Sequence, residues 1–154
     1  MIQNIQKILA PIDFSDFSMQ AMRGAWELAT DVAAEMHLVY VVAPHNTFVP
    51  LPLATDAERT RELARESAML QQADEELARI KKAEFDDSKK IVTAALKGPP
   101  VDKLVEYAVQ QDIDLIVLAT HGRTGAQHIF IGSVAERLAR LAPCSVLVLR
   151  RRQQ

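Results

Sequence analysis

The chain has 154 residues, which predicts one domain over residues 1–154, and its 49% hydrophobic and 25% charged residues are typical of soluble globular proteins. This composition, with a formal net charge of −2, excludes disordered, collagen-like and disulfide-stabilised proteins. The single cysteine, Cys144, cannot form an internal disulfide and no signal peptide is visible, so we expect a protein of the reducing cytoplasm.

In the first half of the chain, predicted strands alternate with predicted helices. Residues 5–12 form an apolar segment that predicts a buried strand. In residues 18–34 the apolar side chains recur every three or four positions, which predicts a helix with Ser18 as its N-cap. Residues 36–43 predict a second strand. Residues 55–83 predict a long helix whose apolar stripe we assign to the core; the stripe consists of Leu63, Leu70, Ala73, Leu77 and Ile80.

The second half of the chain continues this alternation. Residues 89–96 predict a strand, residues 101–110 a helix, and residues 113–119 the most apolar strand. A glycine-rich segment follows, then a predicted helix over 134–141 and a last strand over 145–149. Strands that are apolar on both faces and alternate with helices are typical of an open parallel sheet covered on both sides. The predicted fold class is therefore α/β.

The glycines are concentrated after the fourth predicted strand. The chain has only five, and three of them are Gly122, Gly125 and Gly132. Ser133 and Glu136 match an S-x-x-E capping box, which places a helix N-terminus at Ser133. Ligands of open parallel sheets bind outside the carboxyl ends of strands, and the amides of a helix N-terminus attract anions. Spacing alone leaves two interpretations open, a phosphate site and a long loop before a well-capped helix.

The charge distribution bears on the choice of partners. Residues 1–120 hold 12 basic and 19 acidic side chains, whereas residues 121–154 hold six arginines and one glutamate, which suits an anion. We expect no nucleic-acid partner, because no basic face carries interleaved aromatic residues. We expect no membrane partner, because prolines interrupt the uncharged residues 36–55. The histidines and the cysteine are scattered, so no metal site is predicted.

Several of these segments together resemble the universal stress protein family, in its nucleotide-binding type. The family motif G-x2-G-x9-G-[ST] corresponds to Ala119-x2-Gly122-x9-Gly132-Ser133, with alanine in place of the first glycine. The resemblance covers nearly the whole chain through ILAPIDFS at 8–15, HGRTG at 121–125, GSVAE at 132–136 and APC at 142–144. It implies a single five-stranded sheet with strand order 3-2-1-4-5.

The resemblance also implies an ATP site, with which Mg²⁺ can be associated. It assigns the adenine and ribose contacts to Pro11, Ile12, Asp13 and Val41. It assigns the phosphate contacts to His121, Gly122, Arg123, Gly132, Ser133 and Val134, with Leu118 and Ala119 at the start of the loop. Asp13 either accepts from ribose hydroxyls or holds Mg²⁺ through water, or else it forms a local Asx turn. A homodimer paired through the strand at residues 145–149 is implied as well.

The resulting hypothesis is an ATP-binding regulator of the stress response with little or no turnover, in which the nucleotide biases a dimer or a partner surface. No catalytic residue is assigned. A weak ATPase that uses His121 and Arg123 stays open as one alternative. A dimeric interaction protein without nucleotide is another, because Ala119 weakens binding if that position needs positive φ or close phosphate approach. If Ala119 merely ends the strand, it is harmless.

Overall fold

The computed structural model describes residues 4–44, 55–85, 88, 90–120 and 131–150. The strands are β1 (Lys7–Ile12), β2 (Glu35–Val42), β3 (Ile91–Lys97), β4 (Leu115–Ala119) and β5 (Ser145–Leu149). The helices are α1 (Asp16–Asp31), α2 (Asp56–Phe85), α3 (Pro100–Gln110) and α4 (Ser133–Leu141). Every predicted strand and helix is present, with its ends shifted by a few residues at most.

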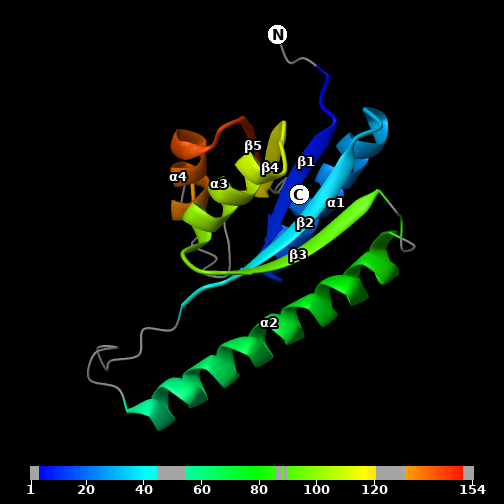
Figure 1. The fold of residues 1–154 in the computed structure, drawn as a ribbon. Coiled ribbons are helices and arrows are strands. Elements are labelled where there is room, and N and C mark those ends of the chain that lie inside the picture. Colours follow the sequence, from blue (N-terminus) through cyan, green and yellow to red (C-terminus); the bar gives the residue numbers. More distant parts are fainter. Residues whose placement is uncertain (1–3, 45–54, 86–87, 89, 121–130, 151–154) are drawn as a thin grey trace.

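The five strands form one parallel sheet in the order β3-β2-β1-β4-β5, which confirms the predicted order. The chain winds outward from β1 to β3 and then returns to the other side of β1 with β4, so the winding reverses between β1 and β4 (Figure 1). Pairing between these two strands joins only Ile8 with Leu115 and Leu9 with Ile116, near the start of each strand. The carboxyl ends of β1 and β4 are therefore where a ligand is expected in such a sheet.

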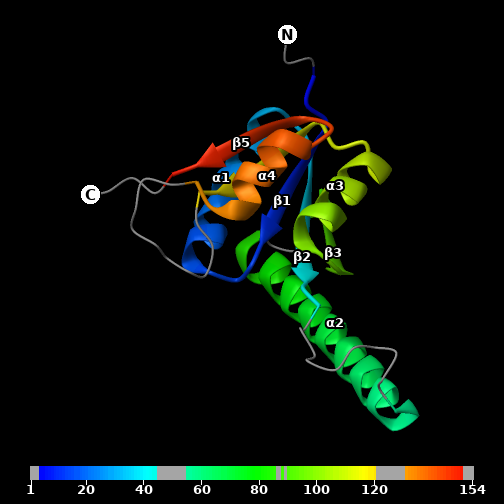
Figure 2. The ribbon, with the colours of Figure 1, turned by 90° about the vertical axis from the view of Figure 1, so that its left-hand side faces the viewer.

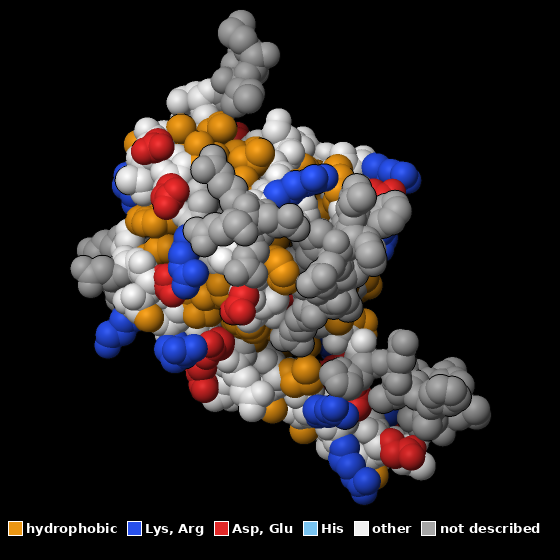
Figure 3. All heavy atoms as spheres, turned by 180° about the vertical axis from the view of Figure 1, so that it is seen from behind, with side chains coloured by type: hydrophobic (Ala, Val, Ile, Leu, Met, Phe, Trp, Pro, Cys, Tyr) orange, Lys and Arg blue, Asp and Glu red, His pale blue; other side chains and the backbone are white. Residues whose placement is uncertain are grey.

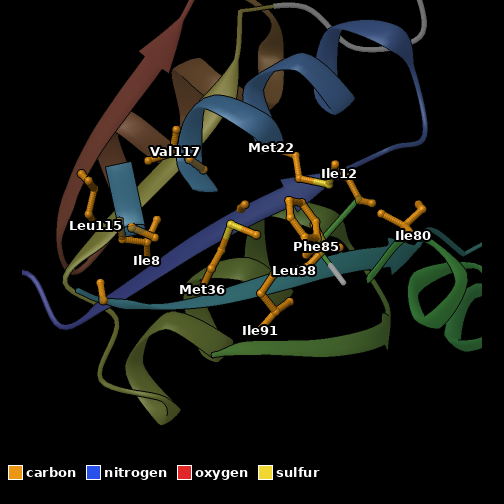
Figure 4. Packing of buried hydrophobic residues seen from close by; sticks show 14 of the residues in the cluster. Ile8, Ile12, Met22, Met36, Leu38, Ile80, Phe85, Ile91, Leu115 and Val117 are labelled. Carbon is orange, nitrogen blue, oxygen red and sulfur yellow. The ribbon is translucent and has the colours of Figure 1, made fainter. Parts of the chain in front are cut away.

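Helices cover both faces of the sheet, α1 and α2 on one face and α3 and α4 on the other (Figures 1 and 2). Along β1 the side chains alternate, so that Ile8 and Ile12 pack toward α1 and α2 whereas Leu9 packs toward α3 and α4. Figure 4 shows the first of these clusters, in which Met22 and Phe85 from the helices contact strand residues. Two separate apolar cores thus hold the sheet in a fixed position under the cavity described below.

The long helix α2 is buried only over its second half. Its buried residues are Ala73, Leu77, Ile80 and Phe85, whereas the side chain of Leu63 is 64% exposed. The prediction that Leu63 belongs to the core is therefore wrong. A helix of 30 residues is about 45 Å long, and strands of five to eight residues are too short to cover it. The first half protrudes beyond the sheet with basic and acidic side chains interspersed (Figures 1 and 3).

Two of the predicted helix caps differ from the structure. The N-cap of α1 is Ser15, whose hydroxyl oxygen accepts from the backbone N–H of Ser18 at 3.2 Å, so Ser18 lies inside the helix. The short turn after β1 brings the helix start closer to the strand than the apolar spacing indicates. The N-cap of α4 is Gly132, without a side-chain hydrogen bond, so the predicted capping box at Ser133 is wrong. A capping box instead starts α2, where Thr55 and Glu58 bond each other's backbone N–H groups.

A buried polar network, which the sequence did not indicate, crosses the interface between β2 and α3. His37 is 2% exposed; its Nε2 lies 2.8 Å from Oε1 of Glu35, and its Nδ1 lies 2.8 Å from the hydroxyl of Tyr107. A carboxylate only accepts, so Nε2 carries the proton and Nδ1 accepts from the tyrosine. Burial lowers the pKa of His37, against the opposing effect of the hydrogen bond to Glu35. Nearby Lys7 lowers the pKa further.

This network makes the stability of the fold dependent on pH. As the pH falls below about 6.5 the unfolded chain protonates His37, whereas the folded chain protonates it only at a lower pH because its pKa is lowered. The free energy of unfolding therefore falls as the pH decreases from 6.5, by at most about 1.4 kcal/mol per pH unit from this group. Urea denaturation between pH 7.5 and 5 measures this slope. His37→Gln should make this slope smaller. Equal slopes in the variant and the wild type would show that His37 does not cause the pH dependence.

Candidate functional site

A cavity of about 310 Å³ lies at the carboxyl ends of β1, β2 and β4, against the first turns of α3 and α4. Nine residues that the resemblance assigns to the nucleotide site line it: Pro11, Ile12, Asp13, Val41, Leu118, Ala119, Gly132, Ser133 and Val134. They come from four segments that are far apart in the sequence. The sheet order brings these segments together, because β1 lies between β2 and β4. The volume is within the range of cavities that hold small molecules.

Three further predicted contacts, His121, Gly122 and Arg123, lie outside the described residues. They stay predictions. The ends of the segment that contains them are joined by a backbone hydrogen bond, in which the N–H of Gly132 donates to the carbonyl oxygen of Thr120 at 2.6 Å. Thr120 and Gly132, which come before and after these residues in the chain, both line the cavity.

Asp13 lies in a tightly hydrogen-bonded turn between β1 and α1. Its Oδ1 accepts from the backbone N–H of Ser15 at 2.9 Å, which is the Asx turn that the sequence left open. Its own N–H donates to the hydroxyl oxygen of Ser18 at 3.2 Å, and that hydroxyl donates to the carbonyl oxygen of Ser15. Asp13 nevertheless lines the cavity, so the turn is compatible with a role toward a ligand.

The opposite wall of the cavity is the N-terminus of α4. Gly132 has φ −58° and ψ 152°, and its carbonyl oxygen accepts from the N–H of Glu136 at 3.0 Å, which starts the helix. Ser133, Val134 and Ala135 follow in the first turn and line the cavity. The first N–H groups of a helix have no intrahelical partner, and the helix dipole is positive there. This wall is therefore the part of the cavity that is best suited to an anion.

The family of the chain follows from comparison with known sequences. The profile of the universal stress protein family matches residues 4–150. The chain belongs to the universal stress protein family. Universal stress protein MJ0531 of Methanocaldococcus jannaschii is 38% identical over 146 residues, which cover 95% of this chain and 82% of that protein.

Solved structures of other universal stress proteins have the same fold. The structure of MJ0577, also from Methanocaldococcus jannaschii, aligns with a TM-score of 0.82 at 26% identity and covers 98% of this chain and 99% of that one. Universal stress protein UspA from Lactobacillus plantarum aligns with a TM-score of 0.79 at 26% identity, covering 96% and 99%. The likeness extends over nearly all of both chains, and it supports the α/β sheet described above for this universal stress protein.

The cavity of this universal stress protein includes residues that the sequence did not point to. They are Ser18, Val39, Tyr40, Pro100, Leu104, Thr120 and Ala135. Val39 was detectable, because side chains two apart on a strand share a face and Val41 was already assigned. Pro100 and Leu104 had no such signal, since only the packing of α3 on the sheet brings them to the cavity. Pro100, Leu104, Val39 and Val41 form an apolar wall that suits a flat aromatic ring.

Ala119, which replaces the first glycine of the family motif, is the last residue of β4. It lies opposite Leu149 of β5 in the parallel register, and its φ is not positive. The position therefore does not need the backbone freedom of glycine, which removes one of the two reasons for which alanine would weaken binding. The structure favours the interpretation in which Ala119 ends the strand.

Two kinds of feature are absent from the residues that the structure describes. No helix in these ranges is both long and apolar enough to cross a membrane. No group of three or more His, Cys, Asp or Glu side chains in the same ranges is placed to hold a metal ion. Asp13 is the one lining residue with a charged side chain among the described residues.

Proposed function

We propose that this universal stress protein binds ATP in the cavity and acts as a nucleotide-dependent regulator in the stress response, with little or no turnover. The observation that carries the proposal is that nine residues assigned from the family resemblance line one cavity of about 310 Å³. Together with Val39, Pro100 and Leu104, they provide an apolar wall, one carboxylate and a helix N-terminus. The three parts match the base, the ribose and the phosphates of a nucleotide in chemical character.

The base and ribose are placed on the β1 and β2 side of the cavity. Val39, Val41 and Leu104 offer apolar surface to the adenine ring. Asp13 lies on the same wall at the end of β1, where its carboxylate accepts from ribose hydroxyls. The alternative role of the same carboxylate is to hold Mg²⁺ through water, where Mg²⁺ accompanies the nucleotide. This orientation leaves the phosphates facing α4.

The phosphates are placed at the first turn of α4. Backbone N–H groups and the Ser133 hydroxyl are the donors there, and the dipole of α4 adds to the attraction. In the sequence, residues 121–154, which include α4, hold six arginines and one glutamate, and this positive balance suits an anion. The alternative of a weak ATPase depends on His121 and Arg123, which lie outside the described residues.

A chain of backbone hydrogen bonds supports a link between the nucleotide and a homodimer. The N–H of Thr120 donates to the carbonyl oxygen of Leu149 in β5 at 3.1 Å, and the carbonyl oxygen of Thr120 accepts from Gly132. The cavity wall at the N-terminus of α4, where we place the phosphates, is thereby joined to β5. This strand lies at the edge of the sheet, and its Leu147 is 39% exposed. An apolar edge strand is suited to pairing with a second copy. We include a homodimer through residues 145–149 in the proposal.

Identifying the small molecule bound to the purified protein tests the proposal directly. Freshly purified protein is denatured, and the released small molecules are identified by chromatography and mass spectrometry, with calorimetric titration of ATP and GTP into the nucleotide-free protein. We expect released ATP and binding of ATP in preference to GTP. ADP or AMP in place of ATP would favour the weak ATPase. No released nucleotide and no heat of binding with ATP would contradict the proposal.

A further inference from the structure

The turn that carries Asp13 contains a strained residue. Phe14 has φ +63°, in the left-handed region that bulky side chains rarely adopt. Three other described non-glycine residues have positive φ, namely Asn4, Ala33 and Asp112. None of these three adjoins a residue that lines the cavity, whereas Phe14 directly follows Asp13. Strain of this kind persists only where the surrounding structure holds it.

The packing of the Phe14 side chain keeps this residue in its strained conformation. Its ring lies against the ring of Tyr40, with centroids 4.5 Å apart and planes at 35°. Both rings are partly buried and pack against the core under α1 and α2. Tyr40 in turn lies opposite Ile12 in the register of β1 and β2, and it lines the cavity. The Phe14 ring is thus anchored to the strand next to the turn, although Phe14 itself is not among the residues that line the cavity.

The left-handed conformation of Phe14 decides where Asp13 lies. The chain passes from β1 to α1 within residues 13–15, and Phe14 is the middle residue. The bond from the N–H of Ser15 to Oδ1 of Asp13 spans Phe14, so the φ and ψ of Phe14 set how Ser15 is oriented relative to the Asp13 carboxylate in this turn. With φ negative at Phe14, the chain between Asp13 and Ser15 takes another direction, and the bonded turn seen here would have to rearrange. The carboxylate would then leave the cavity wall.

We propose that Phe14 is a positioning residue: its ring, anchored on Tyr40, holds a left-handed turn that aims the Asp13 carboxylate at the ribose of the bound nucleotide. The inference rests on the proposed ATP site. It adds that the preference for ribose hydroxyls depends on a residue that does not contact the nucleotide. Phe14 and Asp13 therefore act as one unit.

The test compares ATP with 2′,3′-dideoxy-ATP, which lacks the hydroxyls that Asp13 accepts from. Calorimetric titration of the full-length wild type should give at least about tenfold tighter binding of ATP. Asp13→Ala and Phe14→Val should both lose most of this preference, since a β-branched residue does not adopt φ near +60°. Phe14→Gly should keep the preference, because glycine adopts that φ freely, and yet lower the melting temperature through loss of the ring.

Ala33 offers a matched control. It has φ +58° at the end of α1, and it does not line the cavity. Ala33→Val therefore introduces the same backbone strain, and it should lower stability without changing the preference for ATP. If Phe14→Val does not fold, Phe14→Ala takes its place, because alanine tolerates positive φ better than valine does. The alanine variant should lose part of the preference.

The outcomes separate this inference from the proposed function. A Phe14→Val protein that keeps the ribose preference while Asp13→Ala loses it overturns the role of Phe14 and leaves the ATP site in place. A Phe14→Gly protein that keeps the full preference with an unchanged melting temperature also overturns it, because the ring would then hold nothing in place. A wild type that binds neither nucleotide overturns the proposed function and this inference with it.

Discussion

Gly132→Val should abolish ATP binding and leave the fold intact. Gly132 lines the cavity at the N-terminus of α4, so a valine adds three carbon atoms at the wall where we place the phosphates. The backbone tolerates the change, because φ −58° and ψ 152° are available to any L-residue. The N–H of Gly132 keeps its bond to Thr120. We expect the affinity for ATP to fall at least about a hundredfold, or about 2.7 kcal/mol.

Calorimetric titration with ATP measures this loss, and thermal denaturation checks the fold. Ala139→Val is the matched control, because Ala139 is exposed on the same helix and does not line the cavity. The control introduces the same side chain and should bind ATP as the wild type does. An unchanged affinity for ATP in Gly132→Val would show that the phosphates do not bind at this wall.

Leu77→Ala and Leu63→Ala should differ widely in stability, although both leucines belong to the predicted apolar stripe of α2. Leu77 is fully buried, so its truncation leaves a cavity and should lower the free energy of unfolding by about 2–5 kcal/mol. Leu63 is 64% exposed on the protruding half of the helix, and its truncation should change stability by less than about 0.5 kcal/mol. Urea denaturation at neutral pH measures both.

Each of these two variants is the control of the other. The substitution, the helix and the stripe are the same, and alanine is a good helix former at both positions. A difference in stability therefore reports burial alone. If Leu63→Ala lowers the free energy of unfolding as much as Leu77→Ala does, the first half of α2 is packed against another surface in solution and does not protrude into solvent.

Much of the fold was predictable because each strand and helix is indicated by the pattern of residues that are close together in the sequence. The strand at residues 113–119 is apolar on both faces, and apolar residues recur every three or four positions in the helices, so each strand and helix of the described residues was predicted. Much of the candidate site was predictable for a related reason. Ligand residues of a parallel sheet lie at strand ends and helix starts, and the residues after β1 and before α4 are adjacent in the sequence to those ends.

Other features were not predictable because they depend on packing. The sequence predicts the N-cap of α1 at Ser18, whereas it is Ser15, since apolar spacing marks the buried face of a helix and not its first residue. The contribution of Leu104 to the cavity depends on how α3 lies on the sheet. His37 forms its network with Tyr107, which is 70 residues away in the chain.

The sequence by itself determined the alternation of strands and helices, the order of the strands through the family resemblance, and the two segments that face each other across the cavity. It did so because hydrophobic periodicity and motif spacing are properties of neighbouring residues. Only the tertiary structure decided that Leu77 is buried and Leu63 is not, and that Phe14 adopts a left-handed conformation beside Asp13. Burial and strain depend on contacts with other segments, such as the sheet under α2 and the Tyr40 ring against Phe14.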